Sequence, residues 1–531
     1  MRNQTRVTLA GLGLLALSIG AGRASADAAR TGGSHLTDRT NAADEISAVR
    51  TALGWDSFAT STAVMVAEGE AQFLGTDTSY RLAFDASGRF IESFDGPLPQ
   101  WTGNDGERYW MRDWSNTPRE LVHGERAQAE VASLFATGRW CLEGTPLHFS
   151  MAGTSDENVL ELGFTHLDSV TTGTIAIDRK SHLPLRVTYG SGSSPTTLTF
   201  RDHARTDGLA YPRAIESVQD SILQRTTIRS LRREASGDPR RFKARLDFPT
   251  DVRFVPHAPA AVEVKRVSSG HLLVKPLVNG KDLGWFIFDS GAGTNCISTA
   301  VTEGNLAVPI GEIGARGVGG TVKAHFWRAD SLSLGPMRVT TPLFMELELA
   351  FLEQYFGVPV AGILGFEFLS RCVAELDMTA ASISLFDSRT YALPAEGRWE
   401  PVVLHERVPC VGARFEGANG LYRLDTGAAG ETVALHYQVV HDHRLTEGRD
   451  TKPAESGGVG GNVRTLVGPV RSFILGGHEF RDIQASFATE DKGALSDDYL
   501  WGNIGGDLLA PFRLTFDYPG GRLGFTTRRE D

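Results

Sequence analysis

Two aspartates in this sequence have matching surroundings. Asp289 is followed by Ser290 and Gly291, Asp425 is followed by Thr426 and Gly427, and each triplet ends an apolar run. The aspartates lie 136 residues apart (425 − 289 = 136). Such an acidic residue is either a solvated turn cap or a carboxylate held away from water. Two carboxylates about 3 Å apart cannot both ionise cheaply, so one would act as an acid and the other as a base.

Two further elements repeat around these aspartates. The stretch "GVGG" begins at residue 317 and again at residue 458, an offset of 141 (458 − 317 = 141). The stretch "AGILGFEFLSRC" aligns with "WGNIGGDLLAPF" at an offset of 140 (501 − 361 = 140). Three elements in the same order at nearly constant offsets indicate a duplicated unit. The glycine-rich loops consist of Gly317, Val318, Gly319 and Gly320, and of Gly458, Val459, Gly460 and Gly461.

The duplication predicts two lobes of similar fold. Each unit reads as a strand, an acidic turn, a glycine-rich hairpin, an apolar turn, a short helix and a closing hairpin. We place the lobes at residues 263–390 and 401–531, joined by a connection at 391–400. Related lobes packed about a pseudo-twofold axis bring their acidic turns face to face, so the two carboxylates would share one site. The alternative is that both aspartates only cap turns. In that case the duplicated elements would serve the shape of the protein and not its chemistry.

This part of the chain resembles the aspartic peptidases, in the single-chain, two-lobed form of pepsin but with compact lobes like the retroviral (retropepsin-like) subunit. The resemblance covers about 265 of the 531 residues. It implies a bilobal acid-protease β-barrel fold with Asp289 and Asp425 as the catalytic dyad. It also implies supporting roles for the other triplet residues, which are Ser290, Gly291, Thr426 and Gly427.

The resemblance also implies how a substrate would be held. The two glycine-rich loops would be flaps that close over an extended peptide or protein segment, and neither a metal nor another cofactor is needed. The first loop has no tyrosine at its tip, which pepsin-type enzymes have, so a glycine-built retropepsin-like flap is the closer match.

The first half of the chain has a different pattern. "NAADEISAVRTALGW" predicts an amphipathic helix that stops at Gly54, and most later segments alternate as antiparallel strands do. We therefore predict an antiparallel β domain with a few helices at 41–254 and a linker at 255–262, in a chain that is mainly β. The order of helix, long meander and inserted helices resembles the periplasmic lipoprotein carrier (LolA-like) half-barrel, which shelters an apolar ligand.

The first 26 residues have the pattern of an export signal. Arg2 and Arg6 precede an apolar run, and small residues at Ala24 and Ala26 suit a cleavage site. The alternative is a membrane anchor, but the run contains four glycines and is shorter than the roughly 20 residues that a spanning helix needs. We expect cleavage after Ala26, a polar, disordered segment at 27–40, and a periplasmic or secreted protein without a stable membrane span.

Net charge and cysteine content bear on the possible partners of the protein and on its possible metal sites and disulfides. A net charge of −11 without clustered Lys and Arg argues against nucleic acid as a partner. The four cysteines, Cys141, Cys296, Cys372 and Cys410, are too widely spaced for a zinc motif. They could form disulfides, whose pairing the sequence does not determine, or be small buried apolar residues.

These observations predict an exported aspartic endopeptidase in which water is activated between Asp289 and Asp425. Both aspartates come from one chain, so a monomer would suffice for the site. The alternative is a non-catalytic envelope protein that binds peptides or lipoproteins, either in the same cleft or in the N-terminal half-barrel. Loss of cleavage but not of peptide binding on Asp289→Asn substitution would distinguish the enzyme from the binding protein.

Overall fold

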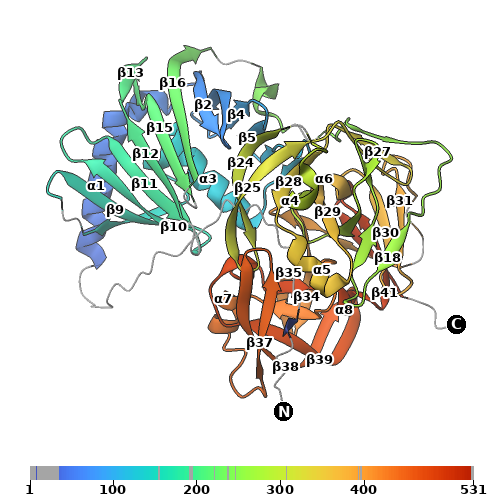
Figure 1. Cartoon of the computed structure of the whole chain (residues 1–531). Helices are drawn as coiled ribbons and strands as arrows, with labels where there is room; N and C mark the ends of the chain where they lie inside the picture. The colour runs from blue at the N-terminus through green and yellow to red at the C-terminus, as the bar shows by residue number, and fades with distance from the viewer. Residues whose placement is uncertain are drawn as a thin grey trace. The chain divides into compact units, whose positions relative to one another are not determined.

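The chain folds mainly into β-strands (Figure 1). The structure is a computed structural model that describes residues 7–8, 35–153, 156–190, 195–219, 222–235, 238–244, 247–306, 308–392, 394 and 397–527. These residues form two compact units, one of residues 35–114 and 118–244, the other of 7–8, 115–117 and 247–527. The prediction of a mainly β protein is confirmed.

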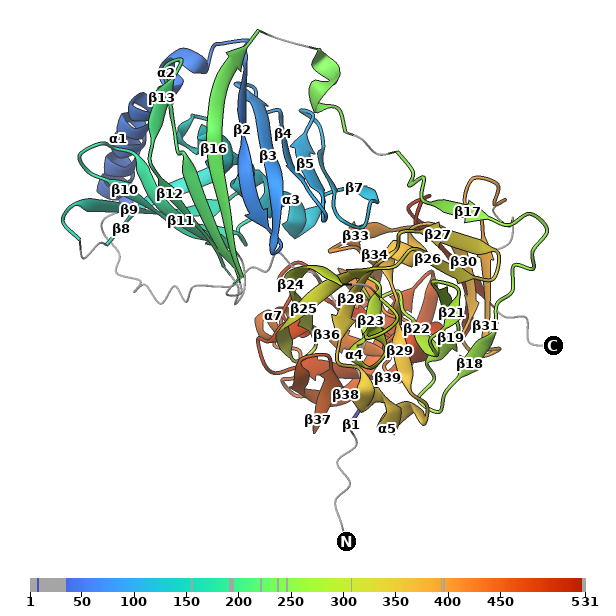
Figure 2. The same cartoon turned by 45° about the horizontal axis from the view of Figure 1, so that its top comes forward.

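The smaller unit is built on one 13-stranded antiparallel sheet (Figure 2). Its strands, in spatial order, are β7 (Pro118–Glu120), β6 (Tyr109–Arg112), β5 (Gln100–Asn104), β4 (Phe90–Asp95), β3 (Thr76–Asp85), β2 (Val64–Phe73), β16 (Ile222–Glu234), β15 (Ala214–Gln219), β12 (Thr196–Arg201), β11 (Pro184–Gly190), β10 (Thr172–Asp178), β9 (Val159–His166) and β8 (Leu147–Ala152). A separate hairpin pairs β13 (Ala204–Thr206) with β14 (Leu209–Tyr211).

Two longer helices share one apolar core with this sheet. Helix α1 (His35–Leu53) contributes Val49 and α3 (His123–Thr137) contributes Leu134 to a buried cluster that also contains Met65 of β2. Gly138 ends α3 in the left-handed conformation (φ 79°), which suits a residue without a Cβ. The shorter helices of this unit are α2 (Trp55–Phe58), η1 (Arg139–Cys141) and η2 (Pro239–Phe242).

Two boundaries differ from the sequence-based expectation. Helix α1 begins at His35, so the segment expected to be disordered at 27–40 is helical in its last six residues (35–40), which contain no glycine or proline to stop a helix. At the other end, β17 (Val252–Phe254) pairs with β27 (Met337–Thr340), and Val252 joins the core of the larger unit. Residues 247–254 therefore belong with the larger unit, in which β17 forms its backbone hydrogen bonds.

The larger unit contains four sheets. The first lobe has an eight-stranded sheet of β18 (Val264–Arg266), β19 (Leu272–Val274), β22 (Trp285–Phe288), β29 (Val360–Leu364), β23 (Cys296–Ser298), β28 (Leu343–Leu347), β25 (Gly320–Arg328) and β24 (Pro309–Gly317). It also has a five-stranded sheet of β17, β27, β26 (Ser331–Leu334), β20 (Leu277–Val278) and β21 (Lys281–Asp282). Its helices are α4 (Thr299–Thr302), η3 (Ala350–Leu352), α5 (Glu353–Phe356) and α6 (Phe366–Leu369).

The second lobe has a nine-stranded sheet. Its order is β1 (Val7–Thr8), β37 (Lys452–Gly458), β38 (Gly461–Leu475), β39 (His478–Ala488), β36 (Val433–Leu435), β40 (Gly502–Ile504), β35 (Ala418–Leu424), β34 (Val408–Phe415) and β33 (Val403–His405). Its helices are α7 (Tyr437–Asp442), η4 (Gly493–Leu495) and α8 (Gly506–Leu509). Apart from Val7 and Thr8, the predicted export signal lies outside the described residues.

A fourth sheet joins the two lobes. Its order is β31 (Ser382–Phe386), β30 (Val373–Asp377), β41 (Phe512–Asp517), β42 (Arg522–Thr527) and β32 (Arg398–Pro401). Its strands β30 and β41, one from each lobe, pair antiparallel and place Glu375 opposite Thr515, two residues separated by the repeat offset (515 − 375 = 140). A pseudo-twofold axis that passes between the two strands would place equivalent residues of the two lobes opposite each other, as this register does. Strand β32 lies partly within the connection predicted at 391–400.

Two further predictions concern the cysteines and membrane spans. All four cysteines are buried free thiols, so the interpretation as small buried residues holds and no disulfide joins them. Within the part of the chain that the structure describes, no helix is long and apolar enough to cross a membrane.

Candidate active site

The two triplet aspartates stand at equivalent strand ends. Asp289 directly follows β22 and Asp425 directly follows β35, and each of these strands pairs in parallel with a buried strand of its own lobe, β29 and β40 respectively. The backbone N–H of Asp289 donates to the carbonyl oxygen of Leu364 (3.1 Å), and that of Asp425 donates to Ile504 (2.9 Å). Each acidic turn is therefore held in the same way, by a hydrogen bond to the buried strand of its own lobe.

The hydroxyls of the triplets tie the two turns together. Ser290 Oγ donates to the carbonyl of Leu424 (2.9 Å) and accepts from the N–H of Thr426 (3.1 Å). Reciprocally, Thr426 Oγ1 donates to the carbonyl of Phe288 (3.1 Å) and accepts from the N–H of Ser290 (2.9 Å). Four buried hydrogen bonds thus connect the lobes beside the aspartates.

The glycine of each triplet lies against the carboxylate of the other lobe. A Cβ added to Gly291 would be 2.4 Å from Asp425 Oδ1, and one added to Gly427 would be 2.3 Å from Asp289 Oδ2. Real Cβ atoms are not found so close to an oxygen, so only glycine permits this approach. The structure therefore brings Asp289 and Asp425 to one site.

Both carboxyl groups are 0% exposed, and three of their oxygens lack a hydrogen-bond partner among the described residues. These oxygens are Asp289 Oδ2 and both oxygens of Asp425; the remaining one, Asp289 Oδ1, accepts from the N–H of Gly291 (2.8 Å). Buried carboxylates are normally paired, so unpartnered ones point to a functional site.

The environment raises the pKa of both aspartates. Burial raises the pKa of Asp289 well above its usual range, and the charge of Asp425 adds to this. Burial also raises the pKa of Asp425, while the dipoles of nearby peptide N–H groups in the acidic turns oppose both shifts. The pair therefore holds a shared proton to a higher pH than an isolated carboxyl group, which leaves one acid and one base.

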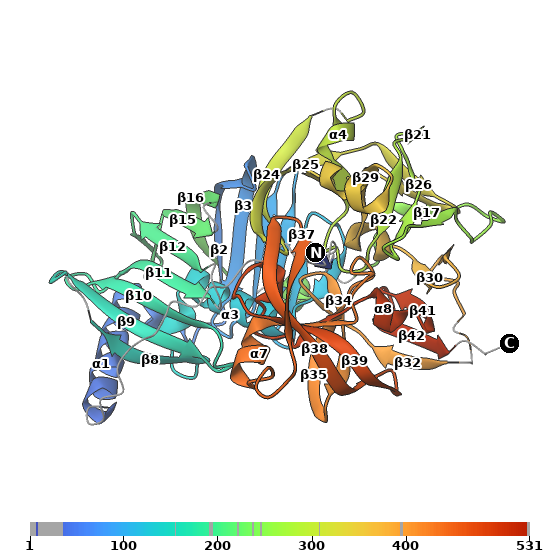
Figure 3. The same cartoon turned by 60° about the horizontal axis from the view of Figure 1, so that its bottom comes forward.

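The predicted flaps are two hairpin tips that touch each other (Figure 3). The stretches 317–320 and 458–461 form the turns between β24 and β25 and between β37 and β38. The N–H of Gly319 donates to the carbonyl of Val459 (3.0 Å), and Val318 is 1% exposed. All eight predicted loop residues therefore lie at the tips of these hairpins.

Two residues that sequence reasoning missed hold the turns across the lobes. His271 Nε2 lies 2.8 Å from the carbonyl oxygen of Gly427, and Arg407 Nε donates to the carbonyl of Gly293 (2.8 Å). Each stands 18 residues before the aspartate of its own lobe (289 − 271 = 18; 425 − 407 = 18). That equal spacing was the signal available in the sequence. Because the two residue types differ, the pair was not recognised as part of the repeat.

Two buried glutamates beside the acidic turns were also missed. Glu367 accepts from Thr294 Oγ1 (2.6 Å) and from the N–H of Asn295 (2.5 Å), whereas Glu431 accepts from Ser486 Oγ (2.7 Å). Burial raises the pKa of each to about 7. No sequence pattern marked these residues, because a glutamate in a short helix or turn is normally solvated.

The stretch at residues 434–445, ALHYQVVHDHRL, contains three histidines, which form no ligand cluster among the described residues. His436 is buried with Nε2 3.1 Å from Asn503 Oδ1, whereas His441 is exposed and contacts Asp442.

Another group, His405, Glu406 and Asp497, has potential ligand atoms within 4.8 Å of one another. However, Arg423 Nη2 donates to both Glu406 Oε2 (3.0 Å) and Asp497 Oδ2 (2.7 Å). The donor set therefore fits an ion-pair network better than a metal centre.

Comparison with known proteins agrees with this geometry over part of the chain. The model of the aspartyl protease family matches residues 274–368, which contain the first acidic turn and the first glycine-rich hairpin. No curated protein sequence matches the chain.

Two solved structures are similar at low identity. One is a DUF1329 family protein from Desulfovibrio piger, with 12% identity over 37% of this chain and 96% of that chain and a TM-score of 0.28. The other is a LolA superfamily protein from Nitrosomonas europaea, with 14% identity over 36% of this chain and 93% of that chain and a TM-score of 0.27.

Proposed function

We propose that this protein is an aspartic endopeptidase whose dyad is Asp289 and Asp425. One observation carries the proposal: two duplicated turns bury two carboxyl groups side by side, and three of their oxygens have no partner among the described residues. The match of residues 274–368 to the aspartyl protease family supports the same reading.

The two carboxyl groups of the dyad, one ionised and one protonated, can take different roles in hydrolysis. The ionised carboxylate takes a proton from a water molecule, and the water oxygen forms a bond to the carbonyl carbon of a peptide. The protonated carboxyl group donates to the carbonyl oxygen as negative charge develops there. When the C–N bond breaks, the amine leaves with a proton from the dyad, and one shared proton remains.

The glycine-rich hairpins supply backbone groups for an extended substrate. A peptide between them could form strand-like hydrogen bonds, with its side chains on alternating sides. We therefore propose peptide or protein segments in extended conformation as the substrate class, with 317–320 and 458–461 as the binding flaps.

Peptide-library cleavage by the mature protein from pH 3 to 8 tests the proposal. We expect Asp289→Asn and Asp425→Asn each to lower kcat/KM by at least about a thousandfold, because each removes one member of a unit that acts together. Asp330→Asn, at an exposed position, is the matched control. Inhibition by pepstatin would report how far the cleft resembles that of pepsin.

Cleavage that persists in both folded dyad variants would exclude this mechanism. If the unsubstituted protein binds library peptides but cleaves none at any pH, the non-catalytic binding protein becomes the better reading.

Export is part of the proposal and rests on residues 1–26. Their Arg-flanked apolar run and the small residues at Ala24 and Ala26 support cleavage after Ala26. N-terminal sequencing of protein from the envelope or the medium should begin at Asp27. Recovery of the uncleaved chain in the cytoplasm alone would contradict export.

A further inference from the structure

The first flap is closed against the second lobe. Its tip residue Val318 is 1% exposed and packs in a cluster with residues of the second lobe, which are Ala434, Val463, Ala488, Ala494 and Leu495. A Cβ added to Gly493 would be 2.0 Å from the carbonyl oxygen of Val318. In the same structure both dyad aspartates are 0% exposed, so a peptide cannot reach them until a covering segment moves.

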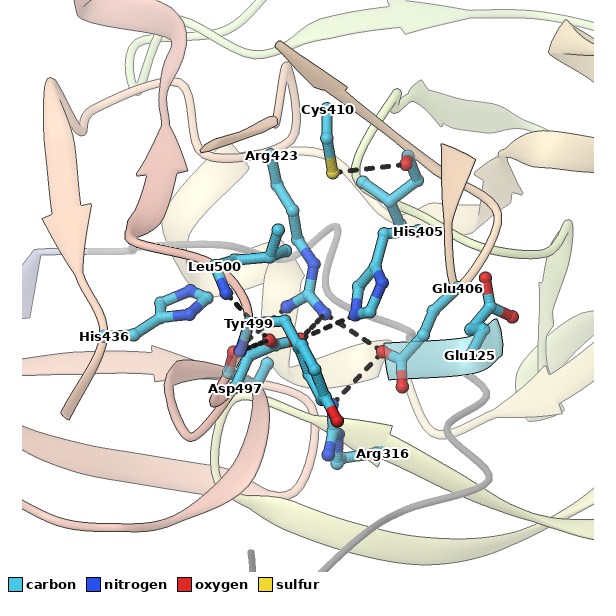
Figure 4. Close-up of polar contacts among 12 residues, drawn as sticks. Glu125, Arg316, His405, Glu406, Cys410, Arg423, His436, Asp497, Tyr499 and Leu500 are labelled. Carbon is cyan, nitrogen blue, oxygen red and sulfur yellow. Dashed lines mark hydrogen bonds and ion pairs between the residues drawn. The ribbon is translucent and has the colours of Figure 1, made fainter. Parts of the chain in front are cut away.

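A buried charge network begins beside this tip (Figure 4). Arg316, the residue before the glycine-rich turn, places Nη2 3.2 Å from Glu406 Oε2 of the second lobe. The same oxygen accepts from Arg423 Nη2 (3.0 Å), which also donates to Asp497 Oδ2 (2.7 Å). His405 Nε2 lies 3.0 Å from that Asp497 oxygen. The network therefore connects the flap to strand β35, in which Arg423 stands two residues before Asp425.

The turn that carries Glu406 is rigidly held. Glu406 and Arg407 have left-handed backbones (φ 51° and 67°) at the tip of the β33–β34 hairpin, which is a strained conformation for side chains with a Cβ. Arg407 Nε anchors the turn to the carbonyl of Gly293, and His405 anchors it to Asp497. Glu406 is thus a fixed acceptor, whereas Arg316 lies in β24 next to the hairpin tip.

The Arg316–Glu406 contact is the link that can separate most easily. When it breaks, Glu406 keeps Arg423 as a partner and no buried carboxylate is left unpaired. By contrast, separation of Arg423 from its two acceptors would leave unpaired charges in the interior, which is strongly unfavourable.

We propose that Glu406 is a positioning residue that holds the first flap closed, and that the Arg316–Glu406 pair must open before a peptide reaches the dyad. The inference rests on the proposed function and adds a control step to it. The flap is then closed in the resting protein, and only the fraction of molecules with a broken pair admits substrate.

Amide hydrogen exchange in the full-length chain tests the closed state without any substrate. We expect Arg316→Gln to speed exchange at Gly319, whose N–H donates to Val459, by roughly threefold to tenfold. Arg316→Lys keeps the charge and should restore part of the protection. Glu312→Gln is the matched control, because Glu312 pairs with Lys323 on the outside of the same hairpin. Unchanged exchange at Gly319 in folded Arg316→Gln would overturn the proposal.

Glu406→Gln tests the other partner of the ion pair. If the Glu406→Gln variant does not fold, Arg316→Gln still tests the proposal, because that substitution leaves the Glu406–Arg423 pair intact. In peptide cleavage, we expect KM of Arg316→Gln to fall by roughly threefold to tenfold while kcat does not rise. A purely structural role predicts a higher KM or a lower folded fraction, and either would contradict the proposal. If no form of the protein cleaves peptides, the proposed function fails, and hydrogen exchange still decides whether the pair holds the flap.

Discussion

At the scale of single residues, Ser290 and Thr426 have the most clearly defined structural role. Each hydroxyl both donates and accepts across the lobes, so truncation leaves two buried backbone groups without a partner. We expect Ser290→Ala to lower the free energy of unfolding by about 2–6 kcal/mol, because each of the two unsatisfied groups costs about 1–3 kcal/mol. Urea unfolding beside the exposed control Ser382→Ala measures this. If Ser290→Ala lowers the free energy of unfolding no more than Ser382→Ala does, the hydrogen bonds of Ser290 Oγ across the lobes do not stabilise the protein.

His271 is the residue whose substitution best tests the cross-lobe contact. Burial lowers its pKa to about 4, so the ring is neutral above that pH and Nε2–H can donate to Gly427 while Nδ1 accepts from Ser269 Oγ. We expect His271→Ala to lower kcat about tenfold with little change in KM, because the turn that carries Asp425 loses its fixed position. His271→Gln, which keeps a donor, should recover part of the rate. An equal loss in both variants would indicate that ring packing, not the hydrogen bond, matters.

At the scale of elements, the contact between the hairpin tips depends on the absence of side chains. A Cβ on Gly319 would be 2.2 Å from the carbonyl oxygen of Gly460, so Gly319→Ala must push the tips apart. We expect faster hydrogen exchange in both hairpins of this variant and an unchanged core. Gly412→Ala is the control, since a Cβ there meets nothing within 4 Å. Normal protection of both tips in Gly319→Ala would mean that the closed contact does not persist in solution.

The same elements show what the sequence could predict. The aspartates, their hydroxyl neighbours and the glycine-rich tips were predictable because duplication repeats short local motifs at nearly constant offsets. Arg316, Glu406 and Arg423 were not, because each is an isolated charge whose partners come from distant elements. The start of α1 was missed for a different reason: polar residues without glycine or proline can extend a helix beyond its amphipathic part.

At the scale of the whole molecule, buried acids make stability depend on pH. The folded-state pKa of Glu431 is about 7, above its ordinary 4.5, so the folded protein binds more protons than the unfolded chain between these values. Stability from this group is therefore lost as pH rises through that window. We expect Glu431→Gln to gain stability relative to the parent as pH rises from 4.5 to 7, by at most about 3 kcal/mol.

Thermal unfolding of both proteins at several pH values measures that difference. Glu447→Gln, at a residue whose side chain is 70% exposed, serves as control and should show no such trend. A difference between Glu431→Gln and the parent that is constant with pH would mean that Glu431 is not held neutral by burial.

The sheet that joins the lobes has a consequence for how the proposed enzyme would behave on dilution. A symmetric two-chain enzyme must associate before its carboxylates meet, so its specific activity falls at low concentration. Here β30 and β41 come from one chain, and residues 387–397 connect the lobes covalently. Activity per molecule should therefore stay constant down to the lowest concentrations that can be assayed. Because the two lobes are parts of one chain, their sequences can differ from each other, as His271 and Arg407 do at equivalent positions.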